Sequence, residues 1–265
     1  MADQQDLDDR IQAYYGGAFD EHARLRSRSA QGRLEHRRVQ ELVCDRVAAG
    51  ARILDIGGGT GAHAITLQGR GYAVSLIDPV AQHVSVAGEA GLDAQVGDAR
   101  DLPFEDASFA ATLMLGPLYH LRAASDRRRA IEEARRVTDS GGWIFAGAIS
   151  RYVAFGQIFL TRDPAEADVE EWVALLRDGA PSRRLRFPAG HFHTAESLER
   201  ELLEAGVVDV HVHGVEGPAG VFMEQLPVDV DPELQSAAAR LADAASEHAG
   251  VRDMSAHLLA IGRVP

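Results

Sequence analysis

Two hydrophobic patterns alternate along residues 51–150: short, nearly continuous apolar runs, and longer stretches in which apolar residues recur at helical spacing. The helical spacing is clearest at 62–69 and 125–137. The apolar runs predict buried strands at 52–56, 73–78, 94–96, 109–115 and 143–149. Strands that alternate with helices in this way are typical of βαβ units, so the pattern predicts a parallel sheet with helices on both faces.

The flanking segments extend this picture. Within 1–50, apolar residues between 33 and 49 recur at helical spacing, and 151–193 interrupt the strand–helix rhythm with another helical pattern, in which Val169, Trp172, Val173 and Leu176 form an apolar face. A helix at 195–205 and strands at 207–215 and 257–261 then resume the rhythm. The predicted parts are an N-terminal helical lid (1–50), a cofactor-binding Rossmann-like core (51–150), a substrate-pocket insertion (151–193) and the C-terminal part of the core sheet (194–265).

The net charge and the amino-acid composition limit which partners and which kinds of chemistry the chain can have. Forty acidic residues outnumber 27 basic ones, which gives a net charge of −13 and makes nucleic acids and anionic membranes poor partners. The chain contains no lysine, so Schiff-base chemistry and the P-loop lysine are both excluded. Cys44 is the single cysteine, so no internal disulfide can form. The acidic start of the chain lacks the features of a signal peptide, and no apolar run is long enough for a membrane span, so we expect a cytoplasmic protein.

A glycine-rich segment, Gly57-Gly58-Gly59-Thr60-Gly61, connects the first predicted strand to the helix at 62–69. Such a turn lets the backbone approach a ligand closely. The spacing of Gly57, Gly59 and Ala62, with Asp78 further on, also satisfies the dinucleotide-binding pattern. However, Asp55 would repel a pyrophosphate, whereas the sulfonium and ammonium groups of S-adenosylmethionine would be attracted to it.

Two further acids follow predicted strands in the manner of a nucleoside site. Asp78, at the end of the second strand, suits the two hydroxyls of a ribose with either cofactor. Asp98 follows the third strand, where it could accept from the adenine amino group while the Ala99 amide donates to the ring. The glycine loop, the two spaced acids and the regular strand rhythm together form a specific signal, and the charge of Asp55 favours S-adenosylmethionine over a dinucleotide.

The motif run RILDIGGGTGAHAITLQGRGYAVSLID, then GDARDLPFEDASFAATLMLGPLYHL and EARRVTDSGGWIF, resembles the class I S-adenosylmethionine-dependent methyltransferases over about residues 50–150. GPLYHL after the fourth strand resembles a subgroup that contains many small-molecule enzymes. The resemblance implies a Rossmann-like, seven-stranded, mostly parallel sheet whose last strand is antiparallel. The chain departs from the family at 139–142, where a proline often precedes the glycines.

The resemblance also implies roles for individual residues. By this similarity the methionine part of the cofactor would be held by Asp55, Gly57, Gly59 and Gly61. Asp78 would hold the ribose, Asp98 and Ala99 the adenine, and the Leu115 backbone would lie near the cofactor ammonium.

The N-terminal stretch resembles the cofactor lid of the same subgroup through Tyr14-Tyr15 and residues 21–25. Tyr15 would cover the cofactor and Arg24 would pair with its carboxylate. The alternatives are that Tyr15 is an aromatic residue that packs between helices and that Arg24 is a surface charge.

Methyl transfer requires alignment of the reactants and exclusion of water, and some acceptors also need a base. His120 follows the fourth strand, at the sheet edge where parallel α/β folds bind ligands, and is the first candidate for that base. A histidine bonded to backbone is the alternative for His120. Tyr14 is a second catalytic candidate, and Tyr119 would shape the pocket.

Two His-x-His pairs are further candidates for functional residues. His191 and His193 border the insertion and are candidate substrate contacts. His211 and His213 share one strand face, which we interpret as a polar outward face; a metal site with Glu216 is the alternative, and no metal is predicted. The expected apolar lining of the acceptor pocket comprises Ile158, Phe159, Trp172, Phe187, Phe192, Phe222 and Met223.

The sequence therefore predicts an enzyme that transfers a methyl group from S-adenosylmethionine to an oxygen, nitrogen or carbon atom of a small organic molecule. Natural-product tailoring is a common role in the subgroup. Two alternatives stay open. One is an NAD(P)-dependent oxidoreductase that uses Gly57, Gly59, Ala62 and Asp78, and the other is a noncatalytic binding protein with the cofactor fold.

Overall fold

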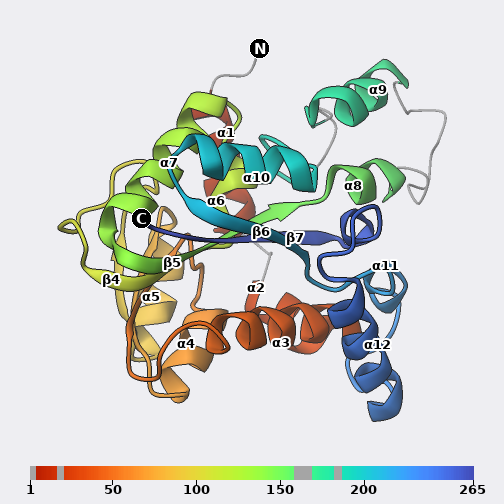
Figure 1. Cartoon of the computed structure of the whole chain (residues 1–265), viewed down its shortest axis with the longest axis horizontal. Coiled ribbons are helices and arrows are strands. Elements are labelled where there is room, and N and C mark those ends of the chain that lie inside the picture. The colour runs from red at the N-terminus through yellow and green to blue at the C-terminus, as the bar shows by residue number, and fades with distance from the viewer. Residues whose placement is uncertain (1–3, 17–20, 158–168, 182–186) are drawn as a thin grey trace.

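A computed structural model describes residues 4–16, 21–157, 169–181 and 187–265, and it contains a seven-stranded sheet in the order β3-β2-β1-β4-β5-β7-β6 (Figure 1). β1 to β5 are parallel, whereas β7 is antiparallel to both of its neighbours. The Rossmann-like fold predicted from the sequence is confirmed. The strands are β1 (Arg52–Ile56), β2 (Ala73–Asp78), β3 (Asp93–Val96), β4 (Phe109–Met114), β5 (Thr138–Ile149), β6 (Val208–Gly214) and β7 (His257–Arg263).

Helices cover both faces of this sheet, as the alternating pattern predicts (Figure 1). The helices of one face pack on it through cores that include Val43 and Leu67; these helices are α3 (Ala30–Cys44), α4 (Ala62–Gly69) and α5 (Ala81–Glu89). The other face is covered by α6 (Pro117–His120), α7 (Ala124–Val137) and α10 (Ala195–Glu204).

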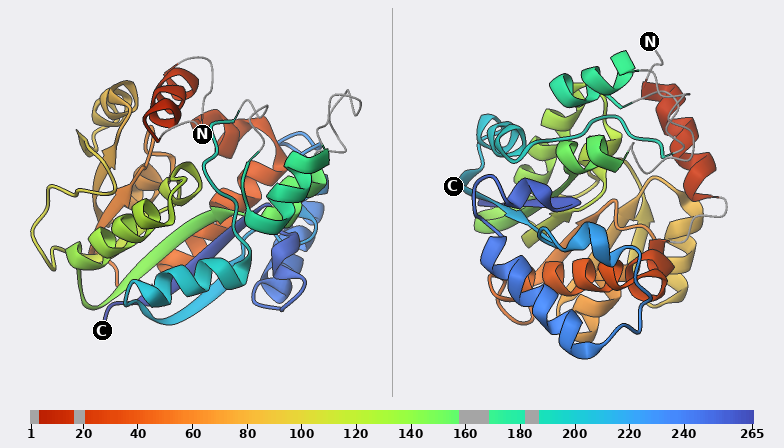
Figure 2. Two further views of the ribbon diagram at one scale, coloured as in Figure 1. Left: turned by 90° about the horizontal axis from the view of Figure 1, so that it is seen from above. Right: turned by 90° about the vertical axis from the view of Figure 1, so that its right-hand side faces the viewer.

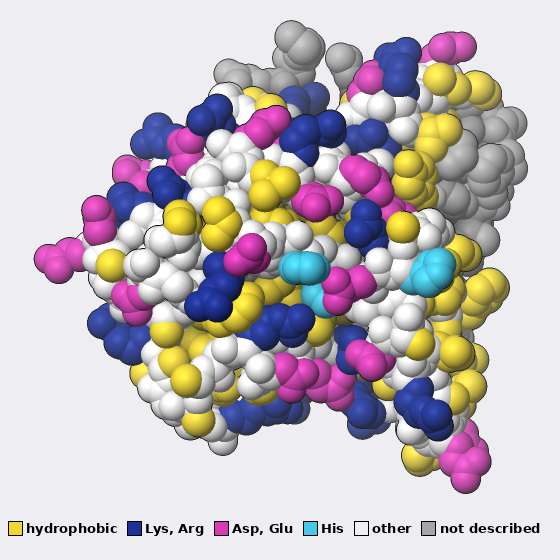
Figure 3. Space-filling model, viewed as in Figure 1, with side chains coloured by type: hydrophobic (Ala, Val, Ile, Leu, Met, Phe, Trp, Pro, Cys, Tyr) yellow, Lys and Arg dark blue, Asp and Glu magenta, His cyan; other side chains and the backbone are white. Residues whose placement is uncertain are grey.

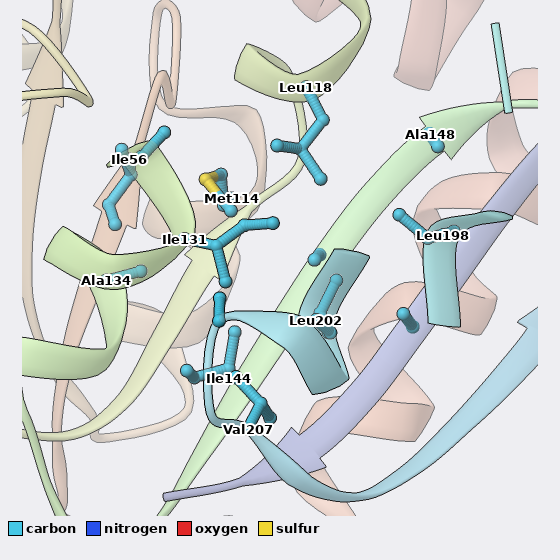
Figure 4. Close-up of a cluster of buried hydrophobic side chains, with 14 of the residues drawn as sticks. Ile56, Met114, Leu118, Ile131, Ala134, Ile144, Ala148, Leu198, Leu202 and Val207 are labelled. Carbon is cyan, nitrogen blue, oxygen red and sulfur yellow. The ribbon is translucent and has the colours of Figure 1, made fainter. Parts of the chain in front are cut away.

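Alternation along β5 shows why the inner strands are almost uniformly apolar. Ile144, Ala146 and Ala148 pack toward α7 and α10, whereas Phe145 points into the core on the opposite face. Figure 4 shows Ile144 and Ala148 in the first of these cores, together with Ile131 of α7 and Leu202 of α10. Because both faces of a central strand are buried, an apolar run is the sequence pattern that such a strand requires.

β5 begins earlier than the sequence suggested. Gly141 and Gly142, which precede the strand predicted at 143–149, lie inside β5, whose register with β4 shifts between Phe109 and Ala111. Gly141 has a φ of 74°, and its amide donates to the carbonyl of Val264. A bulged strand, rather than a turn, therefore accommodates the two glycines.

The remaining helices surround the edge of the sheet at which the strands end. α1 (Gln4–Tyr15) lies next to α5 in the left-hand view of Figure 2 and above it in the right-hand view, and its Leu7 and Ile11 pack on Val80. Short helical segments α2 (Glu21–Ala23) and η1 (Arg24–Arg28) lead into α3. Near the other end of that edge lie α8 (Arg151–Gln157), α9 (Val169–Asp178), α11 (Gly220–Met223), α12 (Pro232–Ala245) and η4 (Arg252–Met254).

The apolar face predicted for α9 is wrong. Leu175 is its fully buried residue and packs with Ala189 and Phe192, while Trp172 packs at the margin of that cluster. Val169 and Val173 are exposed. The prediction used apolar positions at the helical spacing i, i+3, i+4 and i+7, but the face that packs is determined by the neighbouring segment 187–192.

No helix in the described parts of the chain combines the length and the apolar character that crossing a membrane requires. The boundaries at 50, 150 and 193 proposed from the sequence remain predictions.

Candidate functional site

A cavity lies where β1, β2, β3 and β4 end, beneath α1. The glycine loop forms its floor, because Gly57, Gly58 and Gly59 line it directly after β1. Gly57 has a φ of 69° and its amide donates to the carbonyl of Ile77 across 2.7 Å. A Cβ atom added to Gly57 would stand 2.9 Å from the Pro117 ring. The loop therefore needs glycine both for its conformation and for its close approach to α6.

The three predicted loop glycines do not share one environment. A Cβ atom on Gly59 would meet only His83, at 3.8 Å, so this backbone stands open to the cavity. Gly61 is outside the group of residues that line the cavity; it has a φ of 86° and its Cβ position lies against Leu92. Packing and backbone conformation account for Gly61, and its role toward a cofactor remains a prediction.

Asp55 is the acid at the centre of the cavity wall. Its side chain is only 2% exposed and forms no hydrogen bond to any residue within the described ranges. Burial, together with the nearby charge of Asp78, raises the pKa of Asp55 to about 7. A buried carboxyl group without a protein partner favours a ligand that brings its own cation.

Asp78 organises the loop at the end of β2. One of its carboxylate oxygens accepts from the Gly59 amide at 2.9 Å, and the other accepts from the Val80 amide at 2.9 Å. The second oxygen also lies 3.2 Å from Nδ1 of His83, a cavity residue that the sequence analysis missed. His83 falls five positions after Asp78, in the first turn of α5, and that spacing was the available signal.

Asp98 and Ala99 line the far end of the cavity, after β3. The Asp98 carboxylate is already engaged by Arg100, whose backbone amide and guanidinium both donate to it. Burial opposes ionisation of Asp98, but these bonds outweigh it and hold its pKa below the usual range. Arg100, a second residue missed from the sequence, therefore shares this carboxylate with any ligand.

His120 and Tyr15 contact each other in the lining of the cavity. The Tyr15 hydroxyl lies 3.1 Å from Nε2 of His120, while Nδ1 of His120 donates to the Pro188 carbonyl across 2.8 Å. With the proton on Nδ1, Nε2 is left as an acceptor. Burial lowers the pKa of His120 to about 4, although the Pro188 carbonyl and Asp78 oppose the shift. Nδ1 of His120 thus makes the backbone bond of the alternative interpretation, and the role of His120 as a base remains a prediction.

The other lid and pocket residues divide into two groups. Tyr119 and Leu115 line the cavity, as predicted positions for a pocket wall and a cofactor contact. Tyr14 is outside the lining group, and its ring packs edge-on against Tyr15 and Phe187.

Arg24 does line the cavity, but both of its terminal nitrogens donate to Glu35, at 2.6 and 2.9 Å. The surface-charge alternative for Arg24 is therefore wrong. Glu35 and His257 also line this part of the cavity and were not anticipated. Glu35 lies four residues before Val39, on the buried side of α3, and a charged residue at an apolar position was the signal for it.

His191 and His193 lie outside the cavity lining. His193 is completely buried, and its Nε2 lies 3.2 Å from Glu201, which Arg127 also holds at 2.6 Å. Burial lowers the pKa of His191 to about 3. Substrate contact by these two residues remains a prediction, and a fully buried His193 does not favour it.

The outward-face interpretation of the second histidine pair is wrong for one member. His211 is exposed and pairs with Glu247, whereas His213 is buried and bonds to Ser246, which follows α12. The two histidines share one face, but the segment after α12 covers only His213. Glu216 turns away from both, toward His257.

The expected apolar acceptor lining also changes. Phe222 is 76% exposed, and Ile158 and Phe159 lie outside the described residues. The remaining candidates are absent from the cavity lining: Trp172, Phe187, Phe192 and Met223. Phe192 and Met223 instead belong to buried hydrophobic clusters.

Parts of this chain are similar to a known protein family and to known proteins. A family model described as a methyltransferase domain matches residues 54–146. An uncharacterized methyltransferase of Mycobacterium tuberculosis is 33% identical over 140 residues, which are 51% of this chain and 51% of that protein. The chain thus spans about half the length of this relative.

A probable tRNA methyltransferase 9B of Homo sapiens is 36% identical over 93 residues, 35% of this chain and 20% of that protein. Among solved structures, an S-adenosylmethionine-dependent methyltransferase of Thermotoga maritima, described as a possible histamine N-methyltransferase, has a TM-score of 0.56 and 21% identity. That alignment covers 88% of this chain and 92% of the other. The methyltransferase-domain match over residues 54–146 supports the predictions of an enzyme and of S-adenosylmethionine as its cofactor, and the solved structure, at 21% identity, supports the fold.

Proposed function

We propose that this chain, whose residues 54–146 form a class I methyltransferase domain, transfers the methyl group of S-adenosylmethionine to a small organic molecule. We further propose that the reaction serves natural-product tailoring. The observation that carries the small acceptor is the position of α1. Its residues Ile11, Gln12 and Tyr15 line the cavity together with the glycine loop, so cofactor and acceptor must share a space that a helix covers.

The cavity residues fit this cofactor. Asp55 is a buried acid without a protein partner among the described residues, which suits the cationic methionine part, and Gly59 leaves open the space that a Cβ atom would fill. We propose that Asp55, Gly57, Gly59, Gly61 and the Leu115 backbone hold the methionine part, Asp78 the ribose, and Asp98 and Ala99 the adenine. Bound there, S-adenosylmethionine supplies a methyl group on a cationic sulfur that is activated for in-line displacement.

The chain's own residues would align the acceptor and manage its proton. Tyr15 and Tyr119 would exclude water from the reacting end of the cavity, and Nε2 of His120 would take a proton from the acceptor. The resulting charge on His120 is stabilised by the Pro188 carbonyl at Nδ1. Tyr14 touches Tyr15 and not the cavity, so we propose that it positions Tyr15.

Transfer to tRNA is the second candidate, because a matched relative is named as a probable tRNA methyltransferase. The charge of this chain disfavours it. The net charge is −13, and on the face shown in Figure 3 arginine side chains are interspersed with acidic ones. Binding to a phosphate backbone needs a basic surface whose strength depends on salt.

The proposal is tested by calorimetric titration with S-adenosylmethionine, S-adenosylhomocysteine and NAD(P)H, followed by a radioactive methyl-transfer screen of small organic molecules and tRNA. Binding of the first two compounds alone, with transfer to a small molecule, supports the proposal. Binding of the nicotinamide alone would replace it with the oxidoreductase alternative, and transfer to tRNA alone would refute the small acceptor.

Replacement of Asp78 with alanine is expected to weaken S-adenosylhomocysteine binding about 10- to 100-fold, which corresponds to the loss of charged hydrogen bonds. The carboxylate would bind the ribose, and it also orders the loop through the amides of Gly59 and Val80. Calorimetry measures the change. The matched control is Asp229→Ala, at an exposed position, which should leave the affinity unaltered. Unchanged affinity in a folded Asp78→Ala protein would refute the assignment.

Cofactor binding is also expected to release protons near pH 7. Because burial raises the pKa of Asp55 to about 7, this carboxyl group is partly protonated before binding, and a cationic ligand favours its ionised form. The affinity should therefore rise between pH 6 and pH 8, and the apparent binding enthalpy should differ between phosphate and Tris buffers. Asp55→Asn should abolish the buffer dependence. A wild-type enthalpy that is independent of buffer would contradict the expectation.

A further inference from the structure

Four charged groups form a cluster at one end of the cavity. Arg24 of η1 binds Glu35 of α3, and Nδ1 of His257, the first residue of β7, lies 2.5 Å from Glu216 and 3.4 Å from Glu35. Arg24, Glu35 and His257 line the cavity, and Glu216 lies fully buried behind them. The catalytic scheme proposed above uses neither His257 nor Glu216.

Charge balance favours a proton on each ring nitrogen of His257. Glu35 and Glu216 are two buried carboxylates, and Arg24 supplies only one positive charge. An imidazolium at His257 makes the cluster neutral. In agreement, Glu35 and Glu216 outweigh the effect of burial and raise the pKa of His257 to about 9.

Both carboxylates accept hydrogen bonds from protein donors. Glu216 accepts from Gln31 and from the Ser255 hydroxyl, each at 2.6 Å, as well as from the backbone amide and Nδ1 of His257. Both oxygens of Glu35 accept from Arg24. An anion at this end of the cavity would therefore not face a free carboxylate.

The other ring nitrogen of His257, Nε2, differs from Nδ1 in its hydrogen bonding. Its Nε2–H makes no hydrogen bond to any residue that the structure describes, and it belongs to a side chain that is 24% exposed and lines the cavity. A charged N–H group directed at a cavity calls for an acceptor atom from a ligand.

Strand order separates this group from the nucleoside end of the cavity. The residues proposed for ribose and adenine follow β2 and β3, whereas His257 pairs with Ile149 at the end of β5. β1 and β4 lie between them, so His257 is at the end of the cavity away from the residues proposed for ribose and adenine. Beside it, Val39, Val215 and Leu259 give the cavity an apolar wall.

We propose that His257 binds a carboxylate of the methyl acceptor through Nε2–H, and that the acceptor is therefore an apolar molecule carrying an acidic group. The inference rests on the proposed methyltransferase function. The methionine carboxylate of the cofactor has the same chemistry, and the experiment separates the two sources.

Benzoate and its neutral counterpart benzamide serve as probes of the full chain saturated with S-adenosylhomocysteine, at pH 7. We expect benzoate to bind about tenfold or more tightly than benzamide, as a charge-assisted hydrogen bond predicts. His257→Gln should remove this preference, and the matched control His248→Gln, at an exposed position, should retain it. No preference in the wild type, or a preference that survives His257→Gln, would overturn the proposal.

Two further measurements test whether His257 binds the cofactor instead, and replace the variant if it does not fold. If His257 bound the cofactor instead, His257→Gln would weaken S-adenosylhomocysteine but not 5′-methylthioadenosine, which lacks the amino acid, and the proposal would fall. If the variant does not fold, the wild type is compared at pH 7 and pH 10, because deprotonation of His257 above about pH 9, facing Arg24, Glu35 and Glu216, should abolish the preference. A preference that persists at pH 10 would overturn the proposal.

The same probes are applied without S-adenosylhomocysteine. Failure of that compound to bind would refute the cofactor assignment, whereas the comparison of benzoate with benzamide would still decide the role of His257.

Discussion

Replacing His120 with alanine is expected to lower turnover by about 10²- to 10⁴-fold, the usual range for loss of a general base, with little change in the affinity for S-adenosylhomocysteine. Its Nε2 is an acceptor that faces the cavity, 3.1 Å from the Tyr15 hydroxyl, and its Nδ1–H is anchored on Pro188. Single-turnover methyl transfer to an acceptor found in the screen would measure the effect on the chemical step.

The pH dependence gives a second measurement of the same role. Since burial lowers the pKa of His120 to about 4, the imidazole stays unprotonated at neutral pH, and turnover should fall only as the pH drops toward 4. Tyr15→Phe keeps the ring but removes the hydroxyl from Nε2, so it tests whether the proton passes through Tyr15. His248→Ala is the control away from the cavity. A tenfold loss or less in His120→Ala would reduce His120 to a packing residue.

Glu216→Ala is expected to lower the free energy of unfolding by about 3–5 kcal/mol, the cost of removing the fully buried member of an ion pair together with the hydrogen bonds that it accepts. Glu216 is completely buried and accepts from Gln31, Ser255 and His257. Urea denaturation of the variant and the wild type would measure the difference. Glu247→Ala removes an exposed acid that also pairs with a histidine, and it should cost about 1 kcal/mol or less.

The same ion pair makes stability depend on pH. The folded-state pKa of His257 is raised to about 9, so its stabilising contribution is complete below about pH 6.5, its value in the unfolded chain, and is lost as the pH rises through 9. Wild-type stability should therefore decline between pH 7 and pH 10, and the decline should be smaller in Glu216→Ala. Equal declines, or a loss of less than about 1 kcal/mol in the variant at pH 7, would show that the pair does not support the fold.

Most of the sheet could be read from local pattern. β1, β2, α4 and α7 begin and end within one residue of the predicted bounds, because a strand buried on both faces needs an apolar run and a helix on a sheet needs an apolar stripe. Local pattern failed where a partner distant in sequence sets the environment. On α9, segment 187–192 determined that Leu175 is buried and Val173 is not, and the segment after α12 buried His213 but not His211.

The candidate site likewise contains residues that the sequence pattern revealed and residues that only the tertiary structure revealed. The glycine loop, Asp55, Asp78 and Asp98 lie at the ends of consecutive strands in one chain segment. Parallel pairing therefore brings them to one edge of the sheet, and their spacing in the sequence was sufficient to find them. Spacing could not reveal the cluster of Arg24, Glu35, Glu216 and His257. Its members come from three distant parts of the chain, and only the antiparallel pairing of β7 with β5 brings His257 to the cavity. A charge is stabilised by what surrounds it in space, and the order of residues along the chain does not record those surroundings.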